Sequence, residues 1–281
     1  LGGNISIIGA PGNLMGVSAL NELGIETSFF EYLIVGGPML LAGILFFALF
    51  GYKLLPKNSG AASLEDDQFA VKDYSHVPKW KQYMSLAVLV IAILAMVFEK
   101  QIGIKLQVSA SVGAIILILT GVISEKEALK SIDLKTVFLF GGSLALATAL
   151  EHTGAGSLIA DTLIGAMGNE VHPLILLVVI FVITCTMTNF MSNTATTALM
   201  VPIAVSLAQG LGADPRAVVI ATVIAGSCAY ATPIGMPANT MVVGIGGYKF
   251  TDYVKAGLPL ILVSFIICMV ILPVAYPFFP A

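Results

Sequence analysis

The fold is decided by ten consecutive residues in the second half of the chain, which read Thr188-Asn189-Phe190-Met191-Ser192-Asn193-Thr194-Ala195-Thr196-Thr197. Hydroxyl and amide side chains fill most of this stretch, although it interrupts a long apolar run that begins at Leu174. In hydrocarbon each polar group needs a hydrogen-bonding partner, and lacking one is costly. We therefore expect the stretch to hold something polar. The alternative is that these side chains bond back to their own helix or join neighbouring helices.

The composition indicates a polytopic membrane protein. Of 281 residues, 58% are hydrophobic and only 10% are charged, and the mean hydropathy is +0.98. Soluble domains carry about 25% charged residues. The net charge of −3 and the few basic residues give no support for binding nucleic acid. The cysteines lie in apolar runs without metal-ligand spacing, and we interpret them as small buried hydrophobic residues. They are Cys185, Cys228 and Cys268.

Apolar runs predict an all-α fold. The run at 33–55 is long enough to span a hydrocarbon core of about 30 Å, and we expect further membrane helices at 82–98, 106–123, 136–150 and 258–276. Residues 174–208 are different, because the polar stretch divides them into two arms that are each too short for a comfortable crossing. We expect a re-entrant hairpin there. Residues 218–247 are also interrupted, and we expect a broken helix.

Two parts of the chain match one another, each in two blocks. Ser6-x-x-Gly9-x-Pro11-x-Asn13 pairs with Thr232-x-x-Gly235-x-Pro237-x-Asn239. Phe29-x-Glu31-Tyr32-x-x-x-Gly36-x-Pro38 pairs with Phe250-x-Asp252-Tyr253-x-x-x-Gly257-x-Pro259. Two matched blocks in the same order indicate duplicated architecture.

The basic residues predict how the chain lies in the membrane. If the polar linker 56–81 is cytoplasmic, ten of the 13 basic residues lie inside, all except Lys100, Lys105 and Arg216. The same assignment places the C-terminus outside and runs the two matched segments in opposite directions. Inverted repeats with a midplane site on broken helices are the architecture of secondary transporters.

The repeated Gly-x-Pro-x-Asn motif predicts a broken helix in each repeat. Proline removes a backbone donor and clashes one turn back, while glycine tolerates the resulting backbone. Freed carbonyls can coordinate a hard cation, and a half-helix N-terminus favours an anion. The alternative is a proline kink that only shapes helix packing. Residues 174–247 carry no charge outside the Asp214 and Arg216 loop, which favours Na⁺ bound by neutral oxygens over coupling to protons.

Four motifs resemble those of one transporter family. Ser192-Asn193-Thr194 resembles the signature hairpin of the divalent anion/Na⁺ symporter family, the dicarboxylate and sulfate carriers. Phe140-Gly141-Gly142 leading to Glu151-His152-Thr153-Gly154, and Ser227-Cys228-Ala229-Tyr230 leading to Pro237-x-Asn239, are similar to its neighbouring motifs. The resemblance covers essentially the whole chain. It implies an elevator-type homodimer in the bacterial inner membrane that carries a small divalent anion, such as succinate, malate or sulfate, with Na⁺. It implies neither enzymatic activity nor a further cofactor.

The resemblance also implies the residues of the site. Expected substrate contacts are Ser192, Asn193, Thr194, Met236, Pro237, Asn239, Ala10 and Pro11. Expected Na⁺ ligands, divided between two ion sites, are Thr188, Met191, Asn193, Thr232, Gly235, Ser6, Gly9 and Asn13.

Three departures from the family pattern matter. Ala10 and Met236 stand where such carriers often have a hydroxyl residue, which puts a preference for dicarboxylates in doubt. Asn189 stands where several relatives carry an acid. The first repeat lacks its own Ser-Asn-Thr hairpin, so we expect this chain to be the carboxyl-terminal portion of a longer carrier.

These inferences predict three parts. Residues 1–55 end the first repeat, 56–81 form the cytoplasmic linker, and 82–281 form the second repeat. Within the second repeat, 82–135 are scaffold spans and 136–247 are the transport region.

Rival functions remain open from the residues. An anion exchanger or a proton-coupled antiporter of the same superfamily would show no Na⁺ dependence. An intramembrane enzyme would have to use Ser192 or Ser227 as nucleophile with His152 as base, and no nucleophile-elbow motif supports it. A membrane scaffold that carries nothing is the third possibility.

Overall fold

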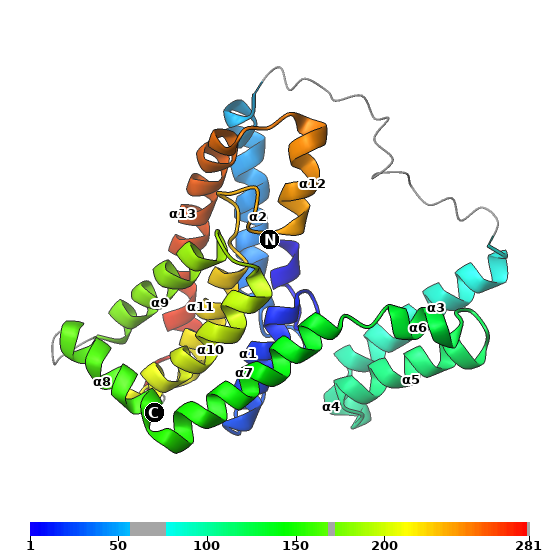
Figure 1. Ribbon diagram of the computed structural model, residues 1–281, viewed down its shortest axis with the longest axis horizontal. Helices are drawn as coiled ribbons and strands as arrows, with labels where there is room; N and C mark the ends of the chain where they lie inside the picture. Colours follow the sequence, from blue (N-terminus) through cyan, green and yellow to red (C-terminus); the bar gives the residue numbers. More distant parts are fainter. Residues whose placement is uncertain (57–76, 168–171, 280–281) are drawn as a thin grey trace. The chain divides into compact units, whose positions relative to one another are not determined.

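The computed structural model describes residues 1–56, 77–167 and 172–279, and every regular element in these ranges is a helix. The predicted all-α class is therefore confirmed. The predicted linker 56–81 lies mostly outside the described residues. Figure 1 shows the helices in chain order. They are η1 (Gly2–Asn4), α1 (Pro11–Glu22), α2 (Leu33–Leu49), η2 (Gly51–Leu54), α3 (Lys79–Val97), α4 (Glu99–Ile102), α5 (Leu106–Leu119), α6 (Glu125–Lys130), α7 (Leu134–Thr153), α8 (Ala155–Met167), α9 (Pro173–Thr188), α10 (Asn193–Gly210), α11 (Pro215–Gly226), α12 (Pro237–Gly246) and α13 (Phe250–Ala275).

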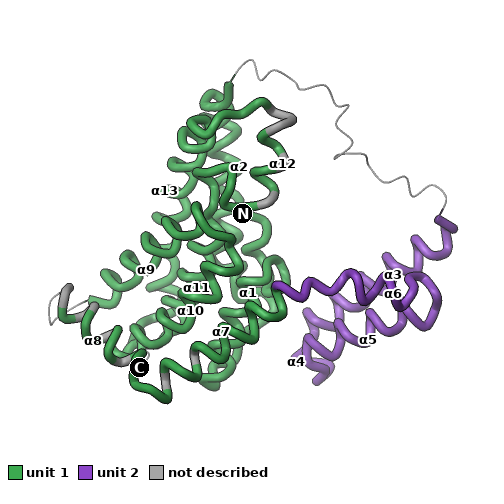
Figure 2. Tube along the Cα trace, in the orientation of Figure 1, with its two compact units in different colours: residues 1–64, 136–281 green, residues 65–135 purple. Residues whose placement is uncertain are grey.

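The chain divides into two compact units, which Figure 2 colours separately. Unit 1 comprises Leu1–Leu64 and Thr136–Ala281, and unit 2 comprises Glu65–Lys135. Both matched parts of the chain, 6–38 and 232–259, lie in unit 1, although the chain between them passes through unit 2.

Two described helices, α3 and α13, are long and apolar enough to cross a bilayer by length and composition. Several others are apolar but shorter, among them both α9 and α11. Helix α13 begins at Phe250, eight residues before the span expected at 258–276. The reason is local, because the Asp252 carboxylate accepts the Lys249 backbone N–H at 2.9 Å and so caps a polar first turn.

Helix α11 forms the core of unit 1. Ten of its 12 residues are buried, and it packs against α1, α9, α10 and α13. Its sequence consists mostly of Ala, Val and Ile, so it has no polar face to present to solvent. A helix that is apolar on all sides is expected to be enclosed by others. The end of this enclosed helix, at Gly226, lies beside the polar stretch described below.

Unit 2 is built on the packing of α3 against α5. A Cβ built on Gly113 would lie 3.5 Å from Val88 and 3.6 Å from Ala92, so the two helices approach closely at this glycine. Ser124 and Glu127 form a capping box that starts α6. Many large apolar side chains of α3 and α5 are exposed, including Leu86, Ile91, Val112 and Ile115. Such a surface is expected to meet lipid or another protein.

Candidate functional site

The polar stretch forms the tip of a helical hairpin. Helix α9 ends at Thr188 and α10 begins at Asn193, so the tip is residues 189–192. Ser192 is the N-cap of α10, and its hydroxyl accepts the Ala195 backbone N–H at 3.3 Å. A serine N-cap satisfies one of the N–H groups that have no partner inside the helix. The remaining free N–H groups of this first turn point toward the tip.

Three oxygen atoms gather where the tip meets the end of α11. The Thr188 hydroxyl donates to the Gly226 carbonyl oxygen at 2.5 Å and also lies 2.8 Å from the Asn193 side-chain oxygen. A hydroxyl has one proton and can donate it to one acceptor. With the Asn193 oxygen facing Thr188, the second contact therefore joins two oxygens with no hydrogen between them. A small cation would relieve that repulsion, and uncharged oxygens are suitable ligands for a hard cation.

Two bends carry the repeated Gly-x-Pro-x-Asn motif, and they have the same backbone geometry. Ala10 precedes α1 with φ −152° and ψ 150°, and Met236 precedes α12 with φ −146° and ψ 149°. Pro11 and Pro237 then occupy the first helical position, where a missing N–H costs nothing. A helix therefore begins at the same position of the motif in both parts of the chain.

The motif asparagines hold these bends together. The Asn13 amide nitrogen donates to the Gly3 and Ser6 carbonyl oxygens, at 2.8 and 2.7 Å. The Asn239 amide nitrogen donates to two carbonyl oxygens, those of Ala229 and Thr232, each at 2.8 Å. Both nitrogens are thus used within the fold, so a ligand would meet the asparagine oxygens. The Asn13 side-chain oxygen is buried and has no hydrogen-bond partner among the described residues.

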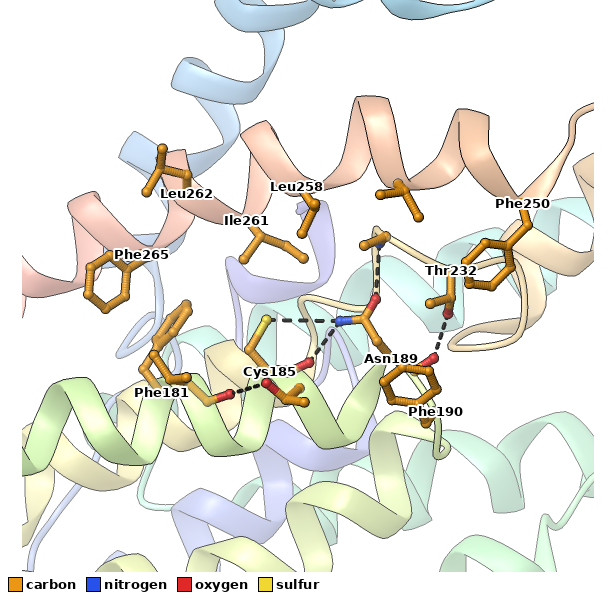
Figure 3. A pocket seen from close by; sticks show the side chains of 14 residues that line it. Phe181, Cys185, Asn189, Phe190, Thr232, Phe250, Leu258, Ile261, Leu262 and Phe265 are labelled. Carbon is orange, nitrogen blue, oxygen red and sulfur yellow. Dashed lines mark hydrogen bonds between the residues drawn. The ribbon is translucent and has the colours of Figure 1, made fainter.

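The hairpin tip is joined to the second bend through Asn189, as Figure 3 shows. Its side-chain oxygen accepts the Ala231 backbone N–H at 3.0 Å, and its nitrogen donates to the Cys185 and Cys228 carbonyl oxygens at 2.7 and 3.3 Å. The Thr232 hydroxyl donates to the Asn189 carbonyl oxygen at 2.5 Å. The hairpin tip at Asn189 is therefore bonded directly to Ala231 and Thr232, in the loop that leads to Pro237.

Close backbone approaches support the same arrangement. A Cβ built on Gly235 would lie 3.0 Å from the Thr188 carbonyl oxygen, so the second bend touches the end of α9. A Cβ built on Gly12 would lie 3.0 Å from the Thr197 hydroxyl, so α1 starts beside the first turns of α10. Figure 1 shows α1 and α12 running in opposite directions from the region where the chain begins.

The predicted site residues fall into two groups. The hairpin tip and the second bend form one group, containing Thr188, Met191, Ser192, Asn193, Thr194, Thr232, Gly235, Met236, Pro237 and Asn239. The first bend forms the other, containing Ser6, Gly9, Ala10, Pro11 and Asn13. Among the described residues no hydrogen bond joins one bend directly to the other. The role of each residue as a ligand stays a prediction.

Several residues that contribute to the site and its bends were not predicted from the sequence. The Gly226 carbonyl belongs to the oxygen cluster but carries no side-chain signal. Tyr32 and Tyr253 contact the motif asparagines, and their place in the matched blocks was the available signal. In the described part of the chain, no hydrogen bond connects His152 with Ser192 or Ser227. The Ser227 hydroxyl instead donates to the Val223 carbonyl oxygen at 3.2 Å.

An apolar groove of about 560 Å³ lies between α9 and α13, and Thr232 of the predicted site is one of its lining residues (Figure 3). Phe181, Phe190, Phe250 and Phe265 are among its lining side chains. Its polar lining groups are already bonded within the protein, as Asn189 illustrates. The groove therefore presents a hydrocarbon surface and no free group for an anion.

Replacing Asn189 with leucine is expected to destabilise the protein. The change leaves the buried Ala231 N–H without its partner, and an unpaired buried group costs about 1–3 kcal/mol. Thermal unfolding in detergent should show a lower melting temperature. The matched control is Asn21→Leu on the exposed face of α1, where the side chain accepts a weak 3.5 Å bond from Thr27. Equal melting temperatures for the two variants would contradict the bridging role.

Comparison with known proteins gives consistent matches. Residues 1–225 match the profile of a family described as citrate transporter. An uncharacterized transporter of Escherichia coli is 36% identical over 156 residues, covering 56% of this chain and 25% of that protein. An uncharacterized transporter of Methanocaldococcus jannaschii is 30% identical over 277 residues, covering 94% of this chain and 59% of that protein.

A third relative carries a more specific name. A sodium-dependent dicarboxylate transporter of Staphylococcus aureus is 27% identical over 307 aligned residues, covering 98% of this chain and 58% of that protein. The chain spans between 25% and 59% of the length of these three relatives.

Proposed function

The chain belongs to the citrate transporter family, among the divalent anion/Na⁺ symporters, and from this membership we propose that it carries a divalent anion across the membrane together with Na⁺. The proposed substrate is a small dicarboxylate or sulfate, and the description of the family adds citrate, a tricarboxylate, as a further candidate. The bacterial inner membrane, with the linker 56–81 in the cytoplasm and the C-terminus outside, remains the proposed location.

The observation that carries the proposal is the oxygen cluster of Thr188, Asn193 and the Gly226 carbonyl. The three atoms are uncharged, and the single proton of the Thr188 hydroxyl cannot serve both acceptors. Na⁺ bound between these oxygens would interact favourably with their lone pairs. Thr188 is fully buried, so water cannot take the place of a ligand easily. Neutral oxygens binding a cation leave a net positive charge beside the tip, which favours an anion there.

The anion would bind at the start of α10. The free N–H groups of its first turn and the dipole of this 18-residue helix favour negative charge. Ser192 is exposed and Thr194 is partly exposed, so both hydroxyls can reach a solute. Met236 beside Pro237 offers no hydroxyl, which limits the donors that the second bend can add.

A second Na⁺ is proposed at the first bend. Ser6, Gly9 and Asn13 supply oxygens there, and the unpartnered buried oxygen of Asn13 supports the assignment because a cation would satisfy it. The duplicated bends and the opposite directions of α1 and α12 are those expected of inverted repeats. We propose an elevator-type homodimer in which unit 1 carries the solute and the exposed apolar helices of unit 2 belong to the scaffold.

Uptake into proteoliposomes tests the proposal. Radiolabelled succinate, citrate and sulfate are compared under an inward Na⁺ gradient and under an equal K⁺ gradient. We expect the Na⁺ gradient to raise the uptake of at least one anion about 10-fold or more, and collapsing the pH gradient to have no effect. Exchange without Na⁺ would identify an exchanger, and stimulation by a pH gradient would identify proton coupling. Either result would overturn the symport proposal.

A further inference from the structure

The two bends are held by the same set of contacts, although they are 226 residues apart in the chain. Beyond the asparagine amide of each bend, each set contains a tyrosine hydroxyl, a glycine and an acidic side chain. These three come from the helix that follows the half-helix and from the turn before it. The first set is Tyr32, Gly36 and Glu31, and the second is Tyr253, Gly257 and Asp252.

The tyrosines act on the asparagine main chain. The Tyr32 hydroxyl donates to the Asn13 carbonyl oxygen at 3.0 Å, and the Tyr253 hydroxyl donates to the Asn239 carbonyl oxygen at 2.8 Å. Each asparagine is the third residue of its half-helix, so its position sets where that helix starts. A hydrogen bond to its carbonyl therefore anchors the first turn of α1 or α12 to the element that carries the tyrosine.

The glycines bring the following helix against the bend itself. A Cβ built on Gly36 would overlap the Asn4 carbonyl oxygen, and one built on Gly257 would overlap the Tyr230 carbonyl oxygen. Asn4 and Tyr230 occupy equivalent positions in the two bends. Only a residue without a side chain permits this approach.

The acidic residues stabilise the turns in which the tyrosines lie. The Glu31 carboxylate accepts the Ser28 N–H at 2.9 Å, and the Asp252 carboxylate accepts the Lys249 N–H at 2.9 Å. Each acid directly precedes its tyrosine in the sequence. Asparagine, acid, tyrosine and glycine thus form one brace, and the brace is present twice.

We propose that Tyr32 and Tyr253 are positioning residues for the two bends. Each tyrosine hydroxyl holds the main chain of its asparagine in place. The asparagine amide nitrogen in turn donates hydrogen bonds to two carbonyl oxygens of the bend. The remaining oxygens and N–H groups of the bend are thereby positioned for ligands. Each hydroxyl therefore ties the first turn of its half-helix, α1 or α12, to the segment that carries the tyrosine. This inference rests on the proposed function for its effect on transport, but the brace itself is testable without transport.

Tyr253→Phe is the test, and Tyr248→Phe is its matched control. The change removes one hydroxyl and keeps the ring, including its edge contact with Tyr248 at 6.1 Å between centroids. Losing a hydrogen bond of this kind corresponds to about a 3- to 10-fold effect. In proteoliposomes we expect the Na⁺ concentration for half-maximal uptake to rise by that factor, while the maximal rate changes less than about 2-fold.

Hydrogen exchange gives the second measurement, and it does not depend on transport. Backbone amides of 238–246 should exchange about 3- to 10-fold faster in Tyr253→Phe than in the unmodified protein, because the first turn opens more often. Tyr248→Phe should leave both measurements unchanged. Tyr32→Phe should repeat the result for amides of 12–22.

The outcomes separate the two proposals. Unchanged exchange in Tyr253→Phe, or an equal increase in Tyr248→Phe, would overturn the brace. If the unmodified protein transports without Na⁺, the proposed symport fails, and faster exchange in Tyr253→Phe alone would still support the brace.

Discussion

Thr188→Val is expected to abolish most Na⁺-driven uptake. Valine has nearly the shape of threonine, so the change removes one oxygen from the cluster with Asn193 and the Gly226 carbonyl, and it also removes the hydrogen-bond donor to that carbonyl. An interaction with a charged partner contributes about 1.5–3 kcal/mol, and each 1.4 kcal/mol is a factor of ten in affinity. We therefore expect the Na⁺ concentration for half-maximal uptake to rise by about 10- to 100-fold. Uptake measured against Na⁺ concentration in proteoliposomes gives this value directly.

Thr186→Val is the matched control for that variant. Thr186 lies on the same helix, two residues earlier, and its hydroxyl donates to the Val182 carbonyl oxygen at 2.7 Å. It lines the apolar groove and lies outside the oxygen cluster. The half-maximal Na⁺ concentration should therefore stay as in the unmodified protein. Equal losses in the two valine variants would show that α9 tolerates no such change, and the cation site at Thr188 would lose its support.

Gly36→Ala is expected to disrupt folding of the first bend. The added methyl group would overlap the Asn4 carbonyl oxygen and lie 2.5 Å from its carbonyl carbon. A backbone carbonyl cannot rotate away as the end of a flexible side chain can, so α2 or the bend has to shift. Overpacking of this kind costs about 1–3 kcal/mol and sometimes more. A clearly lower melting temperature in detergent and little or no uptake should follow.

Its neighbour provides the control. A Cβ on Gly37 would meet only the side chain of Leu33 in the same helix, at 3.3 Å, and a leucine tip can move. Alanine also favours a helix interior over glycine by about 0.5–1 kcal/mol. Gly37→Ala should therefore melt at the same or a higher temperature. If Gly36→Ala behaves like Gly37→Ala, the close approach of α2 to Asn4 is not a constraint on the fold.

Much of the candidate site could be predicted from short-range patterns. The hairpin tip at 189–192 follows from a polar stretch that ends one apolar helix and caps the next at Ser192. The two bends follow from proline at the first position of α1 and α12. Helix α13 begins eight residues before the predicted span at 258–276, because the polar first turn around Asp252 is not part of the apolar run.

The sequence by itself determined the membrane class, the duplicated blocks and the places where helices break, because each depends on residues close together in the chain. Proline lacks an N–H wherever it stands, and serine caps the helix that immediately follows it. Only the tertiary structure decided that the Gly226 carbonyl lies beside Thr188 and that Tyr32 and Tyr253 reach the bends. Those contacts depend on how α1, α9, α10 and α13 pack around α11. Distances between segments that are remote in the sequence cannot be predicted from local sequence patterns.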